Sequence, residues 1–329
     1  MPPRFIDRLP RADYNPRETE GSQPVTTGTD LGARIDQLKV DRRAVILAHN
    51  YQIGEVQDLA DFVGDSLELA RKAVEIEDVE RIVFCGVHFM AETAKLLNPD
   101  RRVLMPDPNA GCPMANMITE RQLREMKAEH PDAAVVCYVN SSAAIKAMSD
   151  ICCTSANGVK VVASIPADRP VIFVPDQSLG DYVAKQLGRE LILWPGYCPT
   201  HHRILAADIE RARADHPAAK VIVHPECTAD VIAAADEVGS TSQILRFCRE
   251  TDAAEVIVGT EMGMLHRLAK ENPGKAFHPV TRLADCPNMK LTTAEKVLWS
   301  LEDDAHEVTV ADTVAAGARR SIERMLNVS

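Results

Sequence analysis

Three cysteines, each followed by proline, are the residues whose type and spacing most clearly indicate chemistry. They are Cys112, Cys198 and Cys286, and they stand 86 and 88 residues apart. Each Cys-Pro pair follows a predicted strand, and proline is preorganised for the first turn of a helix. A helix N-terminus favours a thiolate over a thiol, and the thiolate is the form that binds metal. These three cysteines are therefore candidate metal ligands.

Three thiolates are compatible with two kinds of metal centre. One is a zinc site with an open coordination position, and the other is a 4Fe-4S cluster in which one iron has no protein ligand. The spacing does not decide between them. Structural zinc sites usually contain close Cys-x-x-Cys pairs, which this sequence lacks, so an open catalytic site of either kind is favoured.

The other six cysteines are expected to be free thiols: Cys85, Cys137, Cys152, Cys153, Cys227 and Cys248. Three of them lie in apolar strand or helix patterns and are expected in the core. The N-terminus does not read as a secretory signal, and thiols persist in reducing compartments. A cytoplasmic location is therefore expected.

Polar residues recur in the same spacing as the three Cys-Pro cysteines. The first strand of each third of the chain ends at His49, Tyr138 or His224. In each third, a residue with a hydroxyl side chain stands seventeen positions farther on, at or near the start of a predicted helix. These residues are Ser66, Ser155 and Thr241. Such a hydroxyl suits an N-cap or an anion-binding position, and the two roles are compatible.

Two residues beyond the aligned strand ends stand the best candidates for proton transfer, Tyr51 and Glu226. Tyr138 and Asn140 are candidates to hydrogen-bond a substrate oxygen. His201, close to Cys198, is a further candidate. A histidine satisfied in the core is the alternative for each histidine, but the repeated positions of His49 and His224 favour a site.

The elements that must position these residues are short apolar runs alternating with helical patterns. The runs predict nine buried strands, at 44–48, 81–85, 103–105, 134–139, 171–174, 191–194, 221–223, 255–258 and 276–277. Strands that alternate with helices predict parallel sheets covered on both faces. We therefore expect three similar three-layer α/β domains with short parallel sheets, in a pseudo-threefold arrangement around a central active site at the strand carboxyl ends.

The spacing of the repeats also predicts the domain boundaries. An N-terminal extension at 1–30 precedes a first α/β domain formed by 31–115 together with 287–329. The second domain is 116–200, and the third is 201–286.

Composition excludes several classes of function. Asp and Glu outnumber Lys and Arg 48 to 37 without a basic run, so a nucleic-acid partner is not expected. No apolar stretch approaches the roughly 20 residues that cross a bilayer, so no membrane partner is expected. A Gly-x-Gly-x-x-Gly turn and a Walker motif are both missing, which disfavours nicotinamide and nucleoside triphosphate chemistry.

Ordered motifs from about residue 44 to 300 resemble the quinolinate synthase family. They include His49-Asn50-Tyr51-Gln52, Gly111-Cys112-Pro113-Met114, Gly196-Tyr197-Cys198-Pro199, His224-Pro225-Glu226-Cys227, Gly259-Thr260-Glu261-Met262 and Cys286-Pro287-Asn288-Met289. The resemblance implies a transferase that condenses iminoaspartate with dihydroxyacetone phosphate to quinolinate, with loss of phosphate and water, in NAD biosynthesis. It also implies a central 4Fe-4S cluster held by Cys112, Cys198 and Cys286.

The resemblance implies roles for further residues. Substrate binding would involve His49, Ser66, Tyr138, Asn140, Ser155, His201, His224, Glu226, Ser240 and Thr241. Tyr51 and Glu226 would shuttle protons, with His201 as a third catalytic residue. The match offers little room for arginine clamps, so hydroxyls, histidines and helix N-termini would bind the phosphate. A transient contact with L-aspartate oxidase is a possible partner interaction, because the imine hydrolyses readily.

The sequence departs from the family pattern at one place, and two rival functions stay open. Some relatives carry Cys-x-x-Cys-x-x-Cys near the last ligand, whereas this chain has Cys286 alone, so thiol-disulfide regulation there is not expected. The first rival is a zinc-dependent aldolase or hydratase that uses the same thiolates. The second is a non-catalytic iron-sulfur sensor, which the acidic surface and the ring of acid-base groups disfavour.

Overall fold

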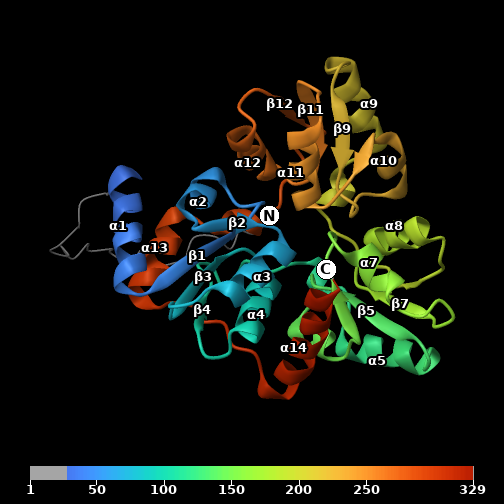
Figure 1. The fold of residues 1–329 in the computed structure, drawn as a ribbon, viewed down its shortest axis with the longest axis horizontal. Helices are drawn as coiled ribbons and strands as arrows, with labels where there is room; N and C mark the ends of the chain where they lie inside the picture. Colours follow the sequence, from blue (N-terminus) through green and yellow to red (C-terminus); the bar gives the residue numbers. More distant parts are fainter. Residues whose placement is uncertain (1–27, 329) are drawn as a thin grey trace, which may run out of the picture.

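The computed structural model describes residues 28–328, so most of the predicted N-terminal extension lies outside the described part. The described chain forms three parallel four-stranded sheets that surround the centre of the molecule (Figure 1). The first sheet contains β1 (Ala44–His49), β2 (Phe62–Gly64), β3 (Arg81–Cys85) and β4 (Arg102–Leu104). Its strand order is β2-β1-β3-β4.

The second and third sheets repeat this order. The second contains β5 (Ala134–Tyr138), β6 (Ile151–Cys153), β7 (Val171–Val174) and β8 (Ile192–Leu193). The third contains β9 (Lys220–Val223), β10 (Glu237–Val238), β11 (Glu255–Gly259) and β12 (Ala276–Pro279). Their orders are β6-β5-β7-β8 and β10-β9-β11-β12. The predicted fold class, three similar α/β units with short parallel sheets, is confirmed.

All nine predicted strands are present, but each sheet has one strand more than predicted. The additional strands, β2, β6 and β10, lie at equivalent sheet edges and are two or three residues long. Runs this short have too few residues to show a strand period.

An aspartate fixes each additional edge strand in the same way. Its carboxylate accepts a hydrogen bond from a backbone N–H fifteen residues earlier, and its own N–H donates to the carbonyl of that residue. The carboxylate bonds join Ile46 N to Asp61 (2.8 Å), Val135 N to Asp150 (2.8 Å) and Val221 N to Asp236 (2.7 Å). The three bonds from the aspartate N–H groups back to the carbonyl oxygens of Ile46, Val135 and Val221 are all 3.0 Å long. This shared device gives the three units the same spacing between the first strand and the hydroxyl seventeen residues beyond its end.

Helices cover the sheets on both faces. The first unit has α1 (Gly28–Asp41), α2 (Gly54–Leu59), α3 (Ser66–Glu75) and α4 (His88–Leu97). The second has α5 (Glu120–Glu129), α6 (Ala143–Ala147), α7 (Gly158–Ala163) and α8 (Gln177–Leu187). The third has α9 (Ala206–Asp215), α10 (Ala229–Ala234), α11 (Thr241–Glu250) and α12 (Met264–Glu271). In the described part of the chain, no helix combines the length and apolar character that crossing a membrane requires.

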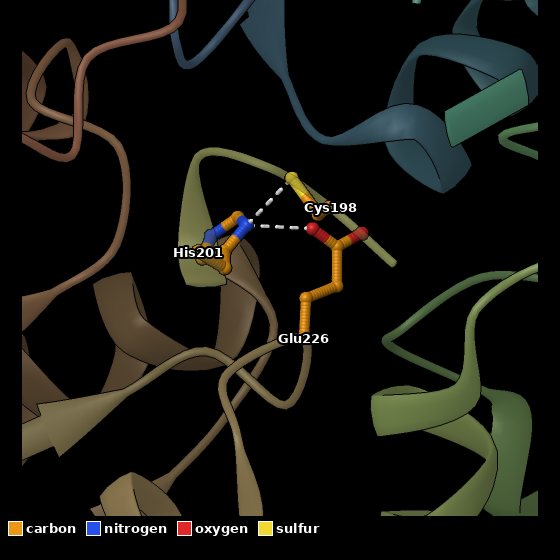
Figure 2. A group of neighbouring side chains, drawn as sticks. All are labelled: Cys198, His201 and Glu226. Carbon is orange, nitrogen blue, oxygen red and sulfur yellow. Dashed lines mark hydrogen bonds and ion pairs between the residues drawn. The ribbon is translucent and has the colours of Figure 1, made fainter. Parts of the chain in front are cut away.

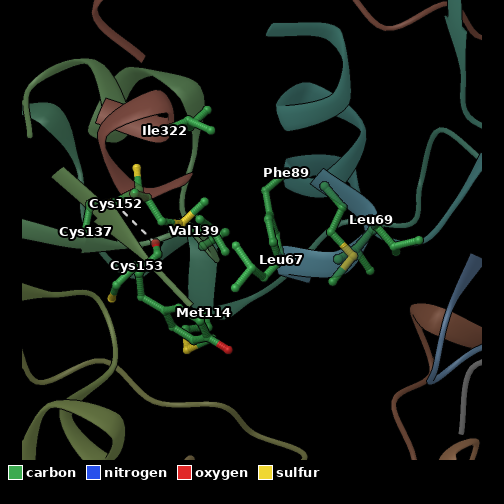
Figure 3. Close-up of a cluster of buried hydrophobic side chains, with 14 of the residues drawn as sticks. Leu67, Leu69, Phe89, Met114, Cys137, Val139, Cys152, Cys153 and Ile322 are labelled. Carbon is green, nitrogen blue, oxygen red and sulfur yellow. Dashed lines mark hydrogen bonds between the residues drawn. The ribbon is translucent and has the colours of Figure 1, made fainter. Parts of the chain in front are cut away.

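The last two helices are α13 (Ala294–Asp303) and α14 (Asp312–Asn327), and α14 joins the first and second units. Helix α13 packs on α1 and β3, whereas α14 packs mainly on α6 and β6 and also contacts α4. Figure 3 shows this shared core, where Leu67 and Phe89 of the first unit and Cys152 of the second belong to one buried cluster with Ile322 of α14. The domain boundaries, which place 287–329 in the first domain, stay a prediction; within that stretch, α14 contacts the second unit as well as the first.

Candidate active site

The three Cys-Pro loops open into one central cavity of about 140 Å³. Its wall is formed by the carboxyl ends of the first strand in each unit and by the loops that carry Cys112, Cys198 and Cys286. All three of these cysteines are half-buried and free. Three segments that are far apart in the sequence therefore present thiols to one space.

The cavity brings together thirteen of the fourteen predicted site residues. Those that line it are His49, Tyr51, Ser66, Cys112, Tyr138, Asn140, Ser155, Cys198, His201, His224, Glu226, Thr241 and Cys286. Ser240 is not among the lining residues. It is buried, and its hydroxyl accepts a hydrogen bond from Gln243 N, so it caps helix α11.

The aligned hydroxyls are not the N-caps of the helices that follow them. Asp65 caps α3 by accepting from two backbone N–H groups, and Ser240 caps α11. Ser66 and Thr241 are the next residues, and both line the cavity. The N-cap alternative is therefore wrong for these two hydroxyls. Ser155 lies three residues before α7 and lines the same cavity.

Each Cys-Pro pair is followed by a short 3₁₀ helix rather than an α-helix. These helices are Met114–Asn116, His201–Arg203 and Met289–Leu291. Their backbone N–H groups donate toward the thiols of Cys112, Cys198 and Cys286. Burial nevertheless raises the pKa of Cys112 to about 12, and it raises the pKa of Cys198 and of Cys286 above the ordinary value. A bound cation is what converts such buried thiols to thiolates.

The remaining six cysteines are free thiols, as predicted, and all six are buried. Cys85, Cys137 and Cys248 lie in the core, and the vicinal pair at 152 and 153 forms no disulfide.

A continuous hydrogen-bonded chain of side chains crosses the cavity and draws on all three units. The Tyr51 hydroxyl is 2.6 Å from Thr260 Oγ1, and that oxygen is 2.9 Å from His201 Nε2. His201 Nδ1 lies 2.7 Å from Glu226 Oε2, and the Tyr138 hydroxyl donates to Glu226 Oε1 at 2.5 Å. We call these five residues the central relay. Figure 2 shows its middle, with His201 between Glu226 and the thiol of Cys198, which is 3.2 Å from Nδ1.

The charges of the central relay follow from burial and hydrogen bonding. Burial opposes ionisation of Glu226, but the charge and hydrogen bond of His201 outweigh it, and the pKa of Glu226 is held well below its usual value. Burial raises the pKa of both tyrosines, Tyr51 and Tyr138, and the nearby Glu226 charge adds to this. Burial also lowers the pKa of His224 to about 3. At neutral pH the relay therefore combines a carboxylate with protonated tyrosines.

Sequence reasoning assigned no role to two residues that hold the site together, Thr260 and Glu261. Thr260 links Tyr51 to His201, as described above. Glu261 accepts a hydrogen bond from Cys286 N at 3.0 Å and pairs with Lys290 at 2.9 Å. Thr260 and Glu261 follow β11, which is not the first strand of its unit, so the repeat did not point to them. Their place in the matched Gly259–Met262 motif was the available signal.

Arg203 was also missed, and it lines the mouth of the cavity. Its side chain is exposed and donates to the carbonyl of Asp285 at 3.3 Å. Among the cavity-lining residues that the structure describes, it is the one arginine or lysine.

The cavity wall contains two candidate sets of metal ligands. Cys198, His201 and Glu226 place their ligand atoms within 4.8 Å of one another, as a single ion requires. Within residues 28–328, the sulfurs of the three Cys-Pro cysteines do not form such a group. At least one pair of the three sulfurs therefore lies farther apart than 4.8 Å. Sulfurs that share one tetrahedral ion at about 2.3 Å lie roughly 3.8 Å apart.

Comparison with known proteins identifies the family of the chain. The sequence profile of the family described as "Quinolinate synthetase A protein" matches residues 33–327. The quinolinate synthase of Dehalococcoides mccartyi strain CBDB1 is 57% identical over 298 residues, covering 91% of this chain and 98% of the relative. That of Alkaliphilus metalliredigens is 50% identical over 301 residues, with 91% and 99% covered. "Quinolinate synthase 1" of Methanosarcina acetivorans is 50% identical over 299 residues, with 91% and 98% covered. The chain therefore belongs to the quinolinate synthetase A family.

Proposed function

We propose that this protein condenses iminoaspartate with dihydroxyacetone phosphate to give quinolinate, phosphate and two molecules of water, as a step in making NAD. The observation that carries the proposal is the common cavity, where three Cys-Pro loops and the central relay meet in a member of this family. Closing a pyridine ring from two small molecules requires several proton transfers. A relay of acid and base groups around one cavity supports such chemistry.

We propose that Cys112, Cys198 and Cys286 hold a 4Fe-4S cluster in this cavity. Their donor chemistry and their spacing, which is wider than a single-ion group, fit a multi-iron group. Bound there, the cluster would leave one iron without a protein ligand and supply a Lewis acid to the substrate.

The side chains of the relay would hold and move protons. Glu226 is the anionic group, and because its pKa is low it would hold a proton removed from substrate only transiently before passing it to His201. Tyr51 stays protonated and is placed to donate to a leaving hydroxyl, and Thr260 and His201 connect it to Glu226. A proton taken up at one end of this chain can therefore be returned at the other.

Polar groups from each unit would orient the substrates. Ser66, Ser155 and Thr241 offer hydroxyls to phosphate or carboxylate oxygens, and Arg203 adds a positive charge at the cavity mouth. In the described chain, the buried Asn140 Oδ1 has no hydrogen-bond partner, so it is available to accept from substrate. His49 and His224 complete the binding wall.

One observation favours a second candidate, a zinc-dependent aldolase or hydratase. Cys198, His201 and Glu226 form a compact mixed set of the kind that binds zinc. A single zinc would use one of the three Cys-Pro cysteines and leave the other two without a metal role.

The test is product formation by protein purified without oxygen. The protein is mixed with iminoaspartate and dihydroxyacetone phosphate, and quinolinate is measured by chromatography. Quinolinate that forms only with both substrates and is lost after exposure to air supports the proposal. Iron-free protein that contains zinc and forms no quinolinate would instead favour the second candidate.

We further propose that the protein works in the cytoplasm and receives iminoaspartate through transient contact with L-aspartate oxidase. Rapid hydrolysis of the free imine is the chemical reason. The test is the quinolinate yield of an assay that couples the oxidase to this protein. If iminoaspartate is transferred directly, an added imine trap should leave the yield unchanged, whereas if it diffuses freely the trap should lower the yield.

A further inference from the structure

A second histidine-carboxylate cluster lies on the third unit, away from the central cavity. His216 follows helix α9, Glu255 is the first residue of β11, and His278 lies in β12. The carboxyl end of β11 leads to Thr260 and the cavity, so Glu255 stands at the opposite end of the strand. We call these three residues the outer cluster.

The geometry of the outer cluster converges on one point. Glu255 Oε2 lies 3.1 Å from His216 Nδ1 and 2.8 Å from His278 Nε2. The two imidazole rings are stacked, with centroids 3.5 Å apart and planes at 16°. The three ligand atoms all lie within 4.8 Å of one another. Two imidazole nitrogens and one carboxylate are the ligand set of many zinc sites with an open position.

The position of the proton on each imidazole bears on what this cluster can bind. A neutral imidazole that carries its proton on the nitrogen facing away from Glu255 presents a lone pair toward the carboxylate. A divalent cation placed between the two nitrogens and the carboxylate would use the lone pairs of both rings and would neutralise Glu255.

The outer cluster is accessible to solvent. The side chains of His216, Glu255 and His278 are 32%, 40% and 26% exposed. A cleft of about 450 Å³ adjoins the two histidines, and its charged lining residues are Asp208, Asp215, Arg211 and Arg282. Water from this cleft can fill the remaining coordination positions of an ion.

We propose that His216, Glu255 and His278 bind a divalent cation of the zinc class, separate from the central site. The ion would tie the end of α9 to β11 and to the edge strand β12. Strand β12 runs into the loop that carries Cys286, so the ion would brace the third unit beside one wall of the cavity without contacting substrate.

The chain offers a matched control in His266. This histidine also contacts a carboxylate, Asp58, at 3.0 Å, but its second neighbour is Lys270, 2.6 Å from the same oxygen. A lysine repels a cation where the outer cluster offers a second imidazole. His266→Ala should therefore leave zinc binding unchanged.

The experiment uses anaerobically purified holoenzyme treated with a mild chelator and dialysed against buffered ZnCl2. Zinc and iron are then measured per chain for the unaltered protein and for the variants His278→Ala, Glu255→Gln and His266→Ala. Glu255→Gln nearly preserves side-chain shape and can still accept a hydrogen bond, so it guards against a misfolded His278→Ala.

We expect uptake of about one zinc per chain with unchanged iron, and a rise in thermal midpoint on adding zinc. His278→Ala and Glu255→Gln should weaken zinc binding by more than about 100-fold, because even the outer partners of metal ligands are worth roughly 10- to 100-fold. Three results would overturn the proposal: no uptake by the unaltered protein, full uptake by both cluster variants, or zinc that enters only as iron leaves.

Discussion

The central relay and the outer cluster both place histidine against a glutamate in the third unit, but they differ in burial. His201 and Glu226 are 1% and 4% exposed, and they touch Cys198, Thr260 and Tyr138. The outer carboxylate, Glu255, is 40% exposed and contacts two half-buried histidines. The same pair of residue types thus stands in two different environments.

This difference explains the separate chemistry that we assign to the two clusters. In a buried site, charges and hydrogen bonds are weakly screened, so the partners of Glu226 decide its charge and the direction of proton transfer. At the surface, screening weakens such effects, while water and ions have free access. Burial therefore suits the central pair for proton transfer and the outer trio for reversible ion binding.

The largest expected effect comes from replacing a proposed ligand of the 4Fe-4S cluster. Cys198→Ser should lose most of its iron and reduce quinolinate formation below detection, because three thiolates are the minimum set for an open cluster. Iron content and turnover of the folded variant are the measurements. Cys248→Ala, a buried cysteine of α11, is the control and should keep its iron. A full complement of iron in Cys198→Ser would refute the ligand assignment.

Glu226→Gln should keep its iron but lower kcat by about 10²- to 10⁴-fold, the usual contribution of a general acid or base. The amide retains the shape of the side chain but cannot take up a proton. Anaerobic kinetics together with iron analysis give the result, with the exposed Glu250→Gln on α11 as control. Turnover within twofold of the unaltered protein would remove Glu226 from the mechanism.

Thr260→Val should lower kcat by roughly 10- to 100-fold, because it breaks the relay between Tyr51 and His201 without changing side-chain shape. Thr260→Ser restores the hydroxyl and should recover most of the activity. Equal activity of the two variants would show that protons do not pass through this hydroxyl.

Asp304 lies outside the central relay and the outer cluster. Its ion pairs show how much ion pairing alone contributes to the stability of the protein. Asp304 binds Arg81 through two hydrogen bonds of 2.6 and 3.0 Å and also pairs with Arg102. The hydrogen bond from Arg81 is the main cause of its lowered pKa. Because the folded pKa lies below the unfolded one, the ion pair stabilises the protein above about pH 4. That stabilisation is lost as the pH falls through the lower, folded pKa.

Asp304→Asn should therefore destabilise the protein by about 1–2 kcal/mol at neutral pH and reduce the loss of stability in acid. Asparagine also accepts the left-handed backbone at this position, where φ is 52°. Thermal midpoints between neutral and acidic pH are the measurement, with exposed Asp303→Asn as control. Parallel pH curves for Asp304→Asn and the unaltered protein would contradict this assignment.

The repeat made much of the fold and site predictable. Because first strands, hydroxyls and Cys-Pro pairs recur at fixed spacing, the sequence alone placed His49, Tyr138 and His224 at equivalent strand ends. The edge strands and the aspartates that fix them were missed, because β10 has only two residues and Asp236 looks like any loop aspartate.

Contacts between units were the least predictable part of the site. Thr260 reaches Tyr51 across 209 residues, and Glu261 reaches Lys290 and Cys286 from the loop that follows β11. No local period records such contacts. Substrate binding by Ser240 stays a prediction: its hydroxyl caps helix α11, and the residue does not line the cavity.

The central claim is that three cysteines from three similar units hold one iron-sulfur cluster in the shared cavity. The most direct measurement is the visible absorption of protein purified without oxygen, together with its iron, sulfide and zinc content. Brown protein with about four irons and four sulfides per chain, bleaching in air, is the predicted result. Colourless protein with zinc and no sulfide would contradict the claim.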